Sequence, residues 1–169
     1  MKDHFTEFAR YNAWANGLLY DAVAAMPDEA YRADEGLFFR SVHGTLNHVI
    51  VADLIWMARF AEAQHAPLAL SDILYERFDE LRAAREAMDR RIVDWFDRLD
   101  EEDYAGEFTY TPVTIPEPVT QRRALAMAHF FNHQTHHRGQ VHAVVTRRTD
   151  VTPEIDLIYF QRHRRLGEI

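Results

Sequence analysis

Histidine is concentrated in one stretch of the chain, HFFNHQTHH over residues 129–137. At about 100° per residue, a helix here places His133 and His137 one turn apart on a single face. That face also carries apolar side chains, namely Ala126, Phe130, Val141 and Val144. Two adjacent imidazoles inside a protein need polar partners, and a divalent metal ion satisfies both at once. The spacing therefore predicts that His133 and His137 are two ligands of one ion.

A third ligand has to come from another helix, and His48 is the best placed. It begins the most apolar part of a helix predicted to follow Ser41, where Asp53 is the one polar residue between positions 49 and 58. His43 and His65 lie nearer to the two ends of that helix. An alternative stays open for His48, because a single interior histidine usually bonds a backbone carbonyl or a carboxylate.

Two further side chains are candidates for roles around the three rings. Asp53 is placed to fix one ring through its second nitrogen, as carboxylates do at many metal sites. The alternative for Asp53 is a pairing with an arginine, Trp14 or Trp56. His136 either lines the pocket or faces solvent, and the sequence favours solvent.

Several sharper motifs are excluded. The metalloprotease motif HExxH has a glutamate after its first histidine, whereas this chain has Gln134, which cannot take a proton. Ferritin-like sites need Glu-x-x-His from two helices, and the spacing from Glu62 to His65 is interpreted as a surface feature. Cysteine is absent, which excludes thiolate ligands, disulfides and a cysteine nucleophile.

The elements that position these residues are mostly helical. Apolar periodicity predicts long helices over about residues 2–26, 42–64, 71–99 and 120–147, with Ser41 as the N-cap of the second. The segment EFTYT at 107–111 is β-prone and is followed by three prolines, which predicts a short hairpin or irregular crossover. A short C-terminal helix is expected after Pro153. We therefore expect an all-α four-helix bundle forming one domain over residues 1–169.

Composition narrows the possible partners. The 19 basic and 27 acidic side chains give a net charge of −8, which disfavours binding to nucleic acid. The longest apolar stretch, residues 49–60, contains Asp53 and Arg59 and is too short to span a membrane. The first ten residues, MKDHFTEFAR, lack the apolar core of a signal peptide. We expect a cytoplasmic protein that contacts neither nucleic acid nor membrane.

Two distant segments together resemble the DinB (damage-inducible) family of metalloenzymes. They are SVHGTLNHVIVADLIW at 41–56 and NHQTHHRGQ at 132–140, and YNAWAN at 11–16 and DLIY at 156–159 extend the likeness over nearly the whole chain. The resemblance implies a four-helix bundle with a divalent metal held by His48, His133 and His137. It also implies a homodimer. Separately, it implies that Asp156 and Tyr159 approach the open coordination position of the metal. Some relatives of this kind transfer or isomerise low-molecular-weight thiols such as mycothiol or bacillithiol.

Three neutral imidazoles with an open coordination position are typical of a catalytic metal site. We therefore expect a divalent-metal-binding protein that acts on a small molecule by hydrolysis or by thiol transfer. Imidazole suits Zn, Ni, Cu and Fe alike, so the ligand type does not select the metal. We expect Zn or Ni, with Fe, Cu or Mn as alternatives. Without cysteine, the chain has to take any thiol from solution. The alternative function is a non-enzymatic, stress-associated bundle whose metal stabilises the core.

Overall fold

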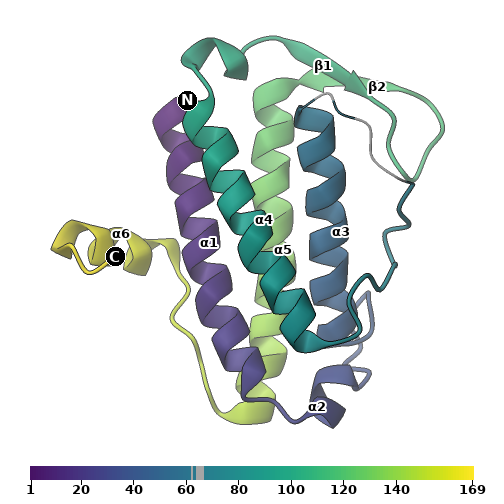
Figure 1. The fold of residues 1–169 in the computed structure, drawn as a ribbon, viewed down its shortest axis with the longest axis vertical. Helices are drawn as coiled ribbons and strands as arrows, with labels where there is room; N and C mark the ends of the chain where they lie inside the picture. Colours follow the sequence, from purple (N-terminus) through teal and green to yellow (C-terminus); the bar gives the residue numbers. More distant parts are fainter. Residues whose placement is uncertain (62, 64–66) are drawn as a thin grey trace.

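Four long helices pack side by side in the computed structural model, which describes residues 1–61, 63 and 67–169 (Figure 1). They are α1 (Lys2–Ala24), α3 (Val42–Phe60), α4 (Phe78–Arg98) and α5 (Arg123–Thr149). Ser41 is the N-cap of α3, because its Oγ accepts a hydrogen bond from the Gly44 amide at 3.0 Å. The all-α bundle and this N-cap are confirmed.

Shorter elements close the two ends of the bundle. The helix α2 (Asp28–Arg32) lies at one end, and η1 (Glu101–Tyr104) leads into the hairpin of β1 (Glu107–Tyr110) and β2 (Val119–Arg122) at the other (Figure 1). The hairpin is antiparallel, with Phe108 opposite Gln121, which confirms the strand predicted at 107–111. The C-terminal α6 (Leu157–Leu166) lies beside α1, where Phe160 packs against Tyr11 and Trp14.

Several predicted boundaries were wrong. The third long helix begins at Phe78 rather than near residue 71, because residues 69–77 run alongside α3 and bond its side chains. The fourth begins at Arg123 rather than at Thr120, because Thr120 pairs with Thr109 in the hairpin. The short α2 and η1 were not predicted. The expected end of α3 at Gln64, and the spacing from Glu62 to His65, lie outside the described residues.

Buried polar side chains form a continuous network across the bundle. Asp53 of α3 accepts hydrogen bonds from Arg85 of α4 at 2.5 Å and from Gln134 of α5 at 2.9 Å. Arg85 also contacts Asp89 at 2.9 Å, and Asp89 accepts a hydrogen bond from Asn16 of α1 at 3.0 Å. Arg138 of α5 completes the network by donating to Asn12 and Asn16. All four long helices therefore contribute side chains to one buried polar network, in which Arg85 pairs with Asp53 and Asp89.

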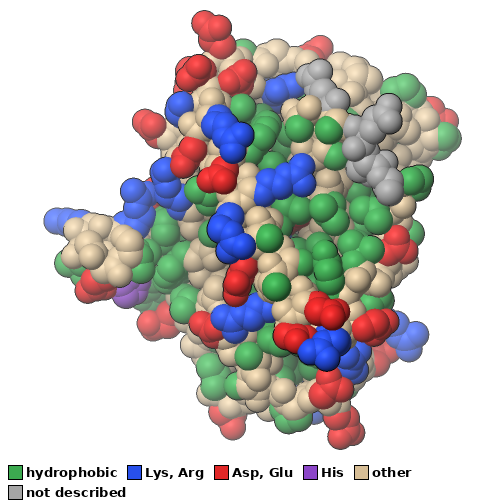
Figure 2. Space-filling model, in the orientation of Figure 1, with side chains coloured by type: hydrophobic (Ala, Val, Ile, Leu, Met, Phe, Trp, Pro, Cys, Tyr) green, Lys and Arg blue, Asp and Glu red, His purple; other side chains and the backbone are tan. Residues whose placement is uncertain are grey.

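The surface over α1 and α4 carries charges of both signs. Basic and acidic side chains are interspersed on the face shown in Figure 2. Arg10 pairs there with Asp97, and Arg82 pairs with Asp21, so ion pairs connect the two helices from outside. Within the described ranges, none of the helices combines the length and the apolar character needed to cross a membrane.

Candidate metal centre

The bundle brings three histidines from two distant segments to one place. His48 lies on α3, and His133 and His137 lie one turn apart on α5, which runs in the opposite direction (Figure 1). One ring nitrogen from each lies within 4.8 Å of the others. This is the group of residues that the helical spacing predicted would meet.

The geometry of the group fits a single metal ion. The Nε2 atoms of His48 and His133 are 3.1 Å apart. Two imidazole nitrogens on one tetrahedral zinc ion, each about 2.05 Å from it, are about 3.3 Å apart. The ring centroid of His137 lies 4.7 Å from that of His48 and 4.5 Å from that of His133. With one nitrogen donor from each ring within 4.8 Å of the others, the three histidines could hold a divalent ion between them.

Hydrogen bonds to the other ring nitrogens fix two of the rings. His48 Nδ1 donates to the Leu70 carbonyl oxygen at 2.8 Å, since a carbonyl can only accept. His137 Nδ1 lies 2.8 Å from Gln140 Oε1, which also only accepts. In both rings the Nε2 lone pair is therefore free to bind a metal, the arrangement that outer hydrogen bonds impose at metal sites.

Burial keeps the three rings neutral. It lowers the pKa of His48 to about 4 and, with the neighbouring imidazoles adding to it, the pKa of His133 to about 3. Burial also lowers the pKa of His137. Because a metal ion binds the neutral form of imidazole, all three are in the binding form at pH 7.

The ring of Phe39 covers His48 on one side. The two rings are stacked with centroids 3.7 Å apart and planes inclined by 16°. The backbone that carries Phe39 packs closely against the first turn of α3, where a Cβ atom at Gly44 would lie 2.2 Å from the Phe39 carbonyl oxygen. Glycine at position 44 thus permits the close approach that holds Phe39 over the ring.

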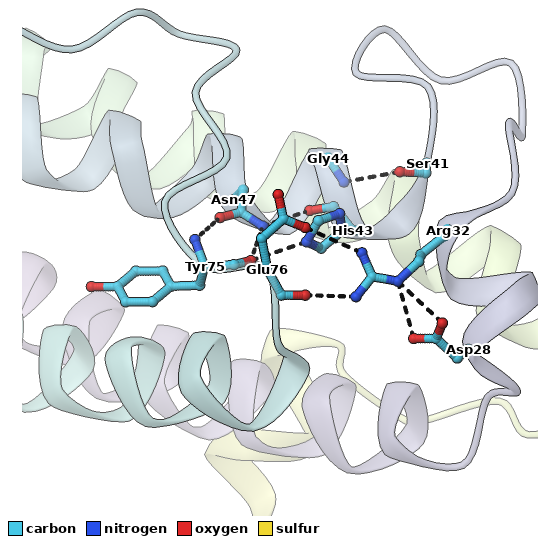
Figure 3. A network of polar contacts seen from close by, with 8 residues as sticks. All are labelled: Asp28, Arg32, Ser41, His43, Gly44, Asn47, Tyr75 and Glu76. Atoms are coloured by element: carbon cyan, nitrogen blue, oxygen red, sulfur yellow. Dashed lines mark hydrogen bonds and ion pairs between the residues drawn. The ribbon is translucent and has the colours of Figure 1, made fainter.

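Residues 69–77, here called the strap, are fastened to α3 by Asn47 and His43 (Figure 3). The Asn47 side chain accepts a hydrogen bond from the Tyr75 amide at 2.9 Å and donates to the Tyr75 carbonyl at 3.1 Å. His43 Nε2 lies 3.0 Å from the same carbonyl, so this histidine helps to hold the strap and is not one of the three histidines that could bind a metal. Arg32 holds the next residue by donating to the Glu76 carbonyl at 2.6 Å. The strap in turn supplies the Leu70 carbonyl to His48.

The remaining predicted residues lie in different places. Asp53 bonds Arg85 and Gln134, which is the arginine alternative, and is not hydrogen-bonded to a ring of the group. His136 is exposed, and its Nε2 accepts a hydrogen bond from Gln140 at 3.3 Å, so that Gln140 connects it to His137. Tyr159 and Asp156 line a separate pocket beside Tyr11 and Arg138. His65 lies outside the described residues.

Leu70, Gln140, Phe39 and Asn47 were missed as supporting residues. Leu70 acts through its backbone, which leaves no mark in the sequence. Asn47 did leave one, because it is an amide immediately before His48 in an apolar helix. In the structure this amide is fully buried, and a buried amide needs hydrogen-bond partners. Gln140 follows His137 by three residues, the helical spacing that places it within reach of the ring.

A pocket of about 190 Å³ reaches the histidine group along α3 and α5. His48 and His133 lie in its wall together with Trp56, Arg59 and His129. The last residue of β1, Tyr110, and the chain after it, with Pro112, Val113 and Thr114, also line the pocket. The ring of Trp56 is 5.3 Å from that of His129 and 5.1 Å from that of Tyr110. A small molecule thus has a place to lie next to two of the three nitrogen donors.

Comparison with known proteins finds similarity over most of the chain. The model of the DinB family matches residues 1–164. Protein DinB of Bacillus subtilis (strain 168) is 28% identical over 155 residues, an alignment that covers 86% of this chain and 86% of the relative.

Proposed function

The chain belongs to the DinB family, and from this premise we propose that it binds a divalent metal ion through His48, His133 and His137 and acts on a small molecule by hydrolysis or by thiol transfer. The observation that carries the proposal is the convergence of three neutral imidazoles with two of their outer nitrogens fixed. Three protein donors are the number typical of catalytic zinc sites, where the fourth position is left to water or substrate.

A divalent ion at this place supplies a Lewis acid that lowers the pKa of a water molecule or a thiol. The chain's own residues hold the reacting molecule and control its surroundings. Trp56 and Tyr110 form apolar walls that displace water from the pocket. Burial, together with the positive charge of Arg59, lowers the pKa of His129, so its ring in the pocket wall stays neutral and can accept a hydrogen bond from the bound molecule.

We expect the ion to be zinc or nickel, with iron, copper or manganese as alternatives, because imidazole ligands suit several of these ions. Metal analysis of protein purified without a histidine tag identifies the ion. We expect close to one ion per chain. A His133→Ala variant, which removes one donor, should lose it. A tag-free protein that binds none of these metals when they are supplied would overturn the proposal.

Activity is tested with the metal-loaded protein against two sets of compounds, thiol adducts and simple esters or amides. We expect turnover in one set that disappears in the His133→Ala variant. The His4→Ala variant should keep it, since His4 is an exposed histidine of α1 and lies outside the group.

The alternative is a stabilising ion, because the three donors join α3 to α5. Thermal unfolding with and without a chelator separates the two functions. A structural ion should cause a large loss of stability when removed, whereas the proposed function expects the fold to persist without it. The expected homodimer and cytoplasmic location stay predictions.

A further inference from the structure

The end of the pocket far from the histidine group is formed by Arg59, in the last turn of α3. Its guanidinium lies over two aromatic rings, 4.8 Å from the centroid of Trp56 and 4.5 Å from that of Tyr110. One nitrogen, Nη2, donates to the Thr111 carbonyl oxygen at 2.9 Å. These contacts hold the planar group in place before any ligand arrives.

Among the described residues Arg59 has no carboxylate partner, in contrast to three arginines that connect the long helices. Arg10, Arg82 and Arg85 each pair with an aspartate, and Arg82 also pairs with a glutamate. Guanidinium has five N–H donors, and the hydrogen bond to Thr111 uses one of them. Arg59 is also partly buried, and a partly buried cation without an anion is costly. An anionic group entering the pocket would remove that cost.

We propose that the small molecule handled at the histidine group carries a carboxylate that pairs with Arg59. This inference rests on the proposed function and names the class of its substrate. Arg59 is the one arginine or lysine among the described residues that line the pocket, which matches a single negative charge better than a phosphate dianion. A guanidinium accepts a carboxylate through two parallel hydrogen bonds.

The distance between the two ends sets the length of the molecule. His48 and Arg59 are eleven residues apart on one helix, which places their Cα atoms about 16 Å apart. Helical side chains lean toward the N-terminus, so Arg59 reaches back toward the group and leaves a gap on the order of 10 Å. The wall between them carries Ile55, Trp56 and Val113. The substrate class is therefore an elongated monocarboxylic acid with an apolar middle.

A pair of thiols that differ only at the far end tests this inference. 6-Mercaptohexanoic acid and 6-mercaptohexan-1-ol share the same sulfur and chain, and their affinities for the zinc-loaded and metal-free protein are measured by calorimetry. The acid is expected to bind about tenfold more tightly than the alcohol. In Arg59→Met this preference should vanish while the affinity for the alcohol stays the same.

Two further variants separate binding from folding. Arg90→Met removes an exposed arginine of α4 outside the pocket and should keep the tenfold preference, which controls for net charge. Arg59→Lys keeps the charge but lacks the planar guanidinium, so this variant should show only part of the tenfold preference. Circular dichroism verifies that each variant is folded.

The inference is overturned if acid and alcohol bind equally to both forms of the wild-type protein, or if the preference survives in Arg59→Met. Cobalt-substituted protein reports separately on the proposed function, because sulfur reaching the metal changes its visible spectrum. A constant spectrum with both thiols would count against the proposed function. Tighter binding of the acid than of the alcohol to the metal-free protein would still test the pairing with Arg59.

Discussion

The carbonyl oxygen of Leu70 accepts a hydrogen bond from His48 Nδ1 at 2.8 Å, although the two residues are 22 positions apart in the chain. A loop residue thus orients one of the three nitrogen donors. Asn47 holds that loop in place by bonding both the amide and the carbonyl of Tyr75. The orientation of His48 therefore depends on the side chain of its own neighbour in the sequence.

Replacing Asn47 with alanine should weaken metal binding without removing a ligand. The strap loses two hydrogen bonds, so the Leu70 carbonyl is held less firmly against His48. We expect the metal affinity to fall by about tenfold, as is typical when an outer hydrogen-bond partner is lost. Competition with a chromophoric chelator measures the change. The control is Asn132→Ala, an exposed asparagine on α5, and equal losses in the two variants would contradict the role of the strap.

Removing any one of the three donors should have a larger effect. The single variants His48→Ala, His133→Ala and His137→Ala each leave two donors, and we expect metal affinity to fall by roughly 100-fold or more in each. Elemental analysis after dialysis measures the bound metal per chain. His4→Ala should retain it, because His4 is an exposed histidine of α1 that lies outside the group. Retention in all three donor variants would show that the ion binds elsewhere.

Gly44→Ala should destabilise the protein and loosen the cover over His48. The new Cβ would lie 2.2 Å from the Phe39 carbonyl oxygen, so the backbone carrying Phe39 has to shift. We expect the free energy of unfolding to fall by about 1–3 kcal/mol, measured by urea denaturation. Gly17→Ala is the matched control, since open space surrounds that position on α1, and it should gain about 0.5–1 kcal/mol. Equal stabilities for the two variants would contradict the steric argument.

Asp53→Ala should affect the fold much more than the metal. Asp53 is fully buried, and its loss leaves Arg85 and Gln134 without their shared acceptor. We expect a loss of about 3–5 kcal/mol in the free energy of unfolding. Asp21→Ala, which breaks the exposed pair with Arg82, should cost about 1 kcal/mol or less. If Asp53→Ala instead keeps its stability and loses the metal, the aspartate acts on the site.

The metal-free protein should become less stable as the pH falls below about 6.5. Burial lowers the pKa of His48 to about 4 and of His133 to about 3, so between these values and 6.5 these two side chains bind more protons in the unfolded chain than in the folded one, and together they outweigh Asp53, whose pKa burial raises to about 6. Acid therefore favours unfolding. Urea denaturation at pH 7, 6 and 5 measures this slope. A double variant, His48→Gln with His133→Gln, should show a smaller fall in stability, and an unchanged slope would contradict the assigned cause.

The sequence predicted the bundle and the meeting of the three histidines because both follow from helical periodicity. His133 and His137 interrupt an apolar face of α5, and His48 lies in the apolar part of α3. Their convergence needs only that the two faces pack together. The strap could not be predicted in the same way, because its contact with His48 goes through the Leu70 backbone. Every residue has a backbone carbonyl oxygen, so the sequence does not reveal which one contacts His48.

The partner of Asp53 was left open for a different reason. Its arginine lies on α4, where most charged side chains face solvent. Yet Arg85 shares the helical spacing of the buried Leu81, Met88 and Ile92, so the pattern places it among core positions. A charge at a core position is itself a sign that an opposite charge lies across the interface.

The buried polar network also constrains how the helices can be aligned along one another. Sliding or rotating a long helix by one residue would carry a charged or amide group out of reach of its partners, so these hydrogen bonds favour the register seen here. His133 directly precedes Gln134 on α5, and His48 lies five residues before Asp53 on α3. The buried polar network that constrains the register of α3 and α5 therefore also constrains the spacing of the imidazoles. Transferring the three histidines to another helical scaffold would require a comparable network to hold its helices in register.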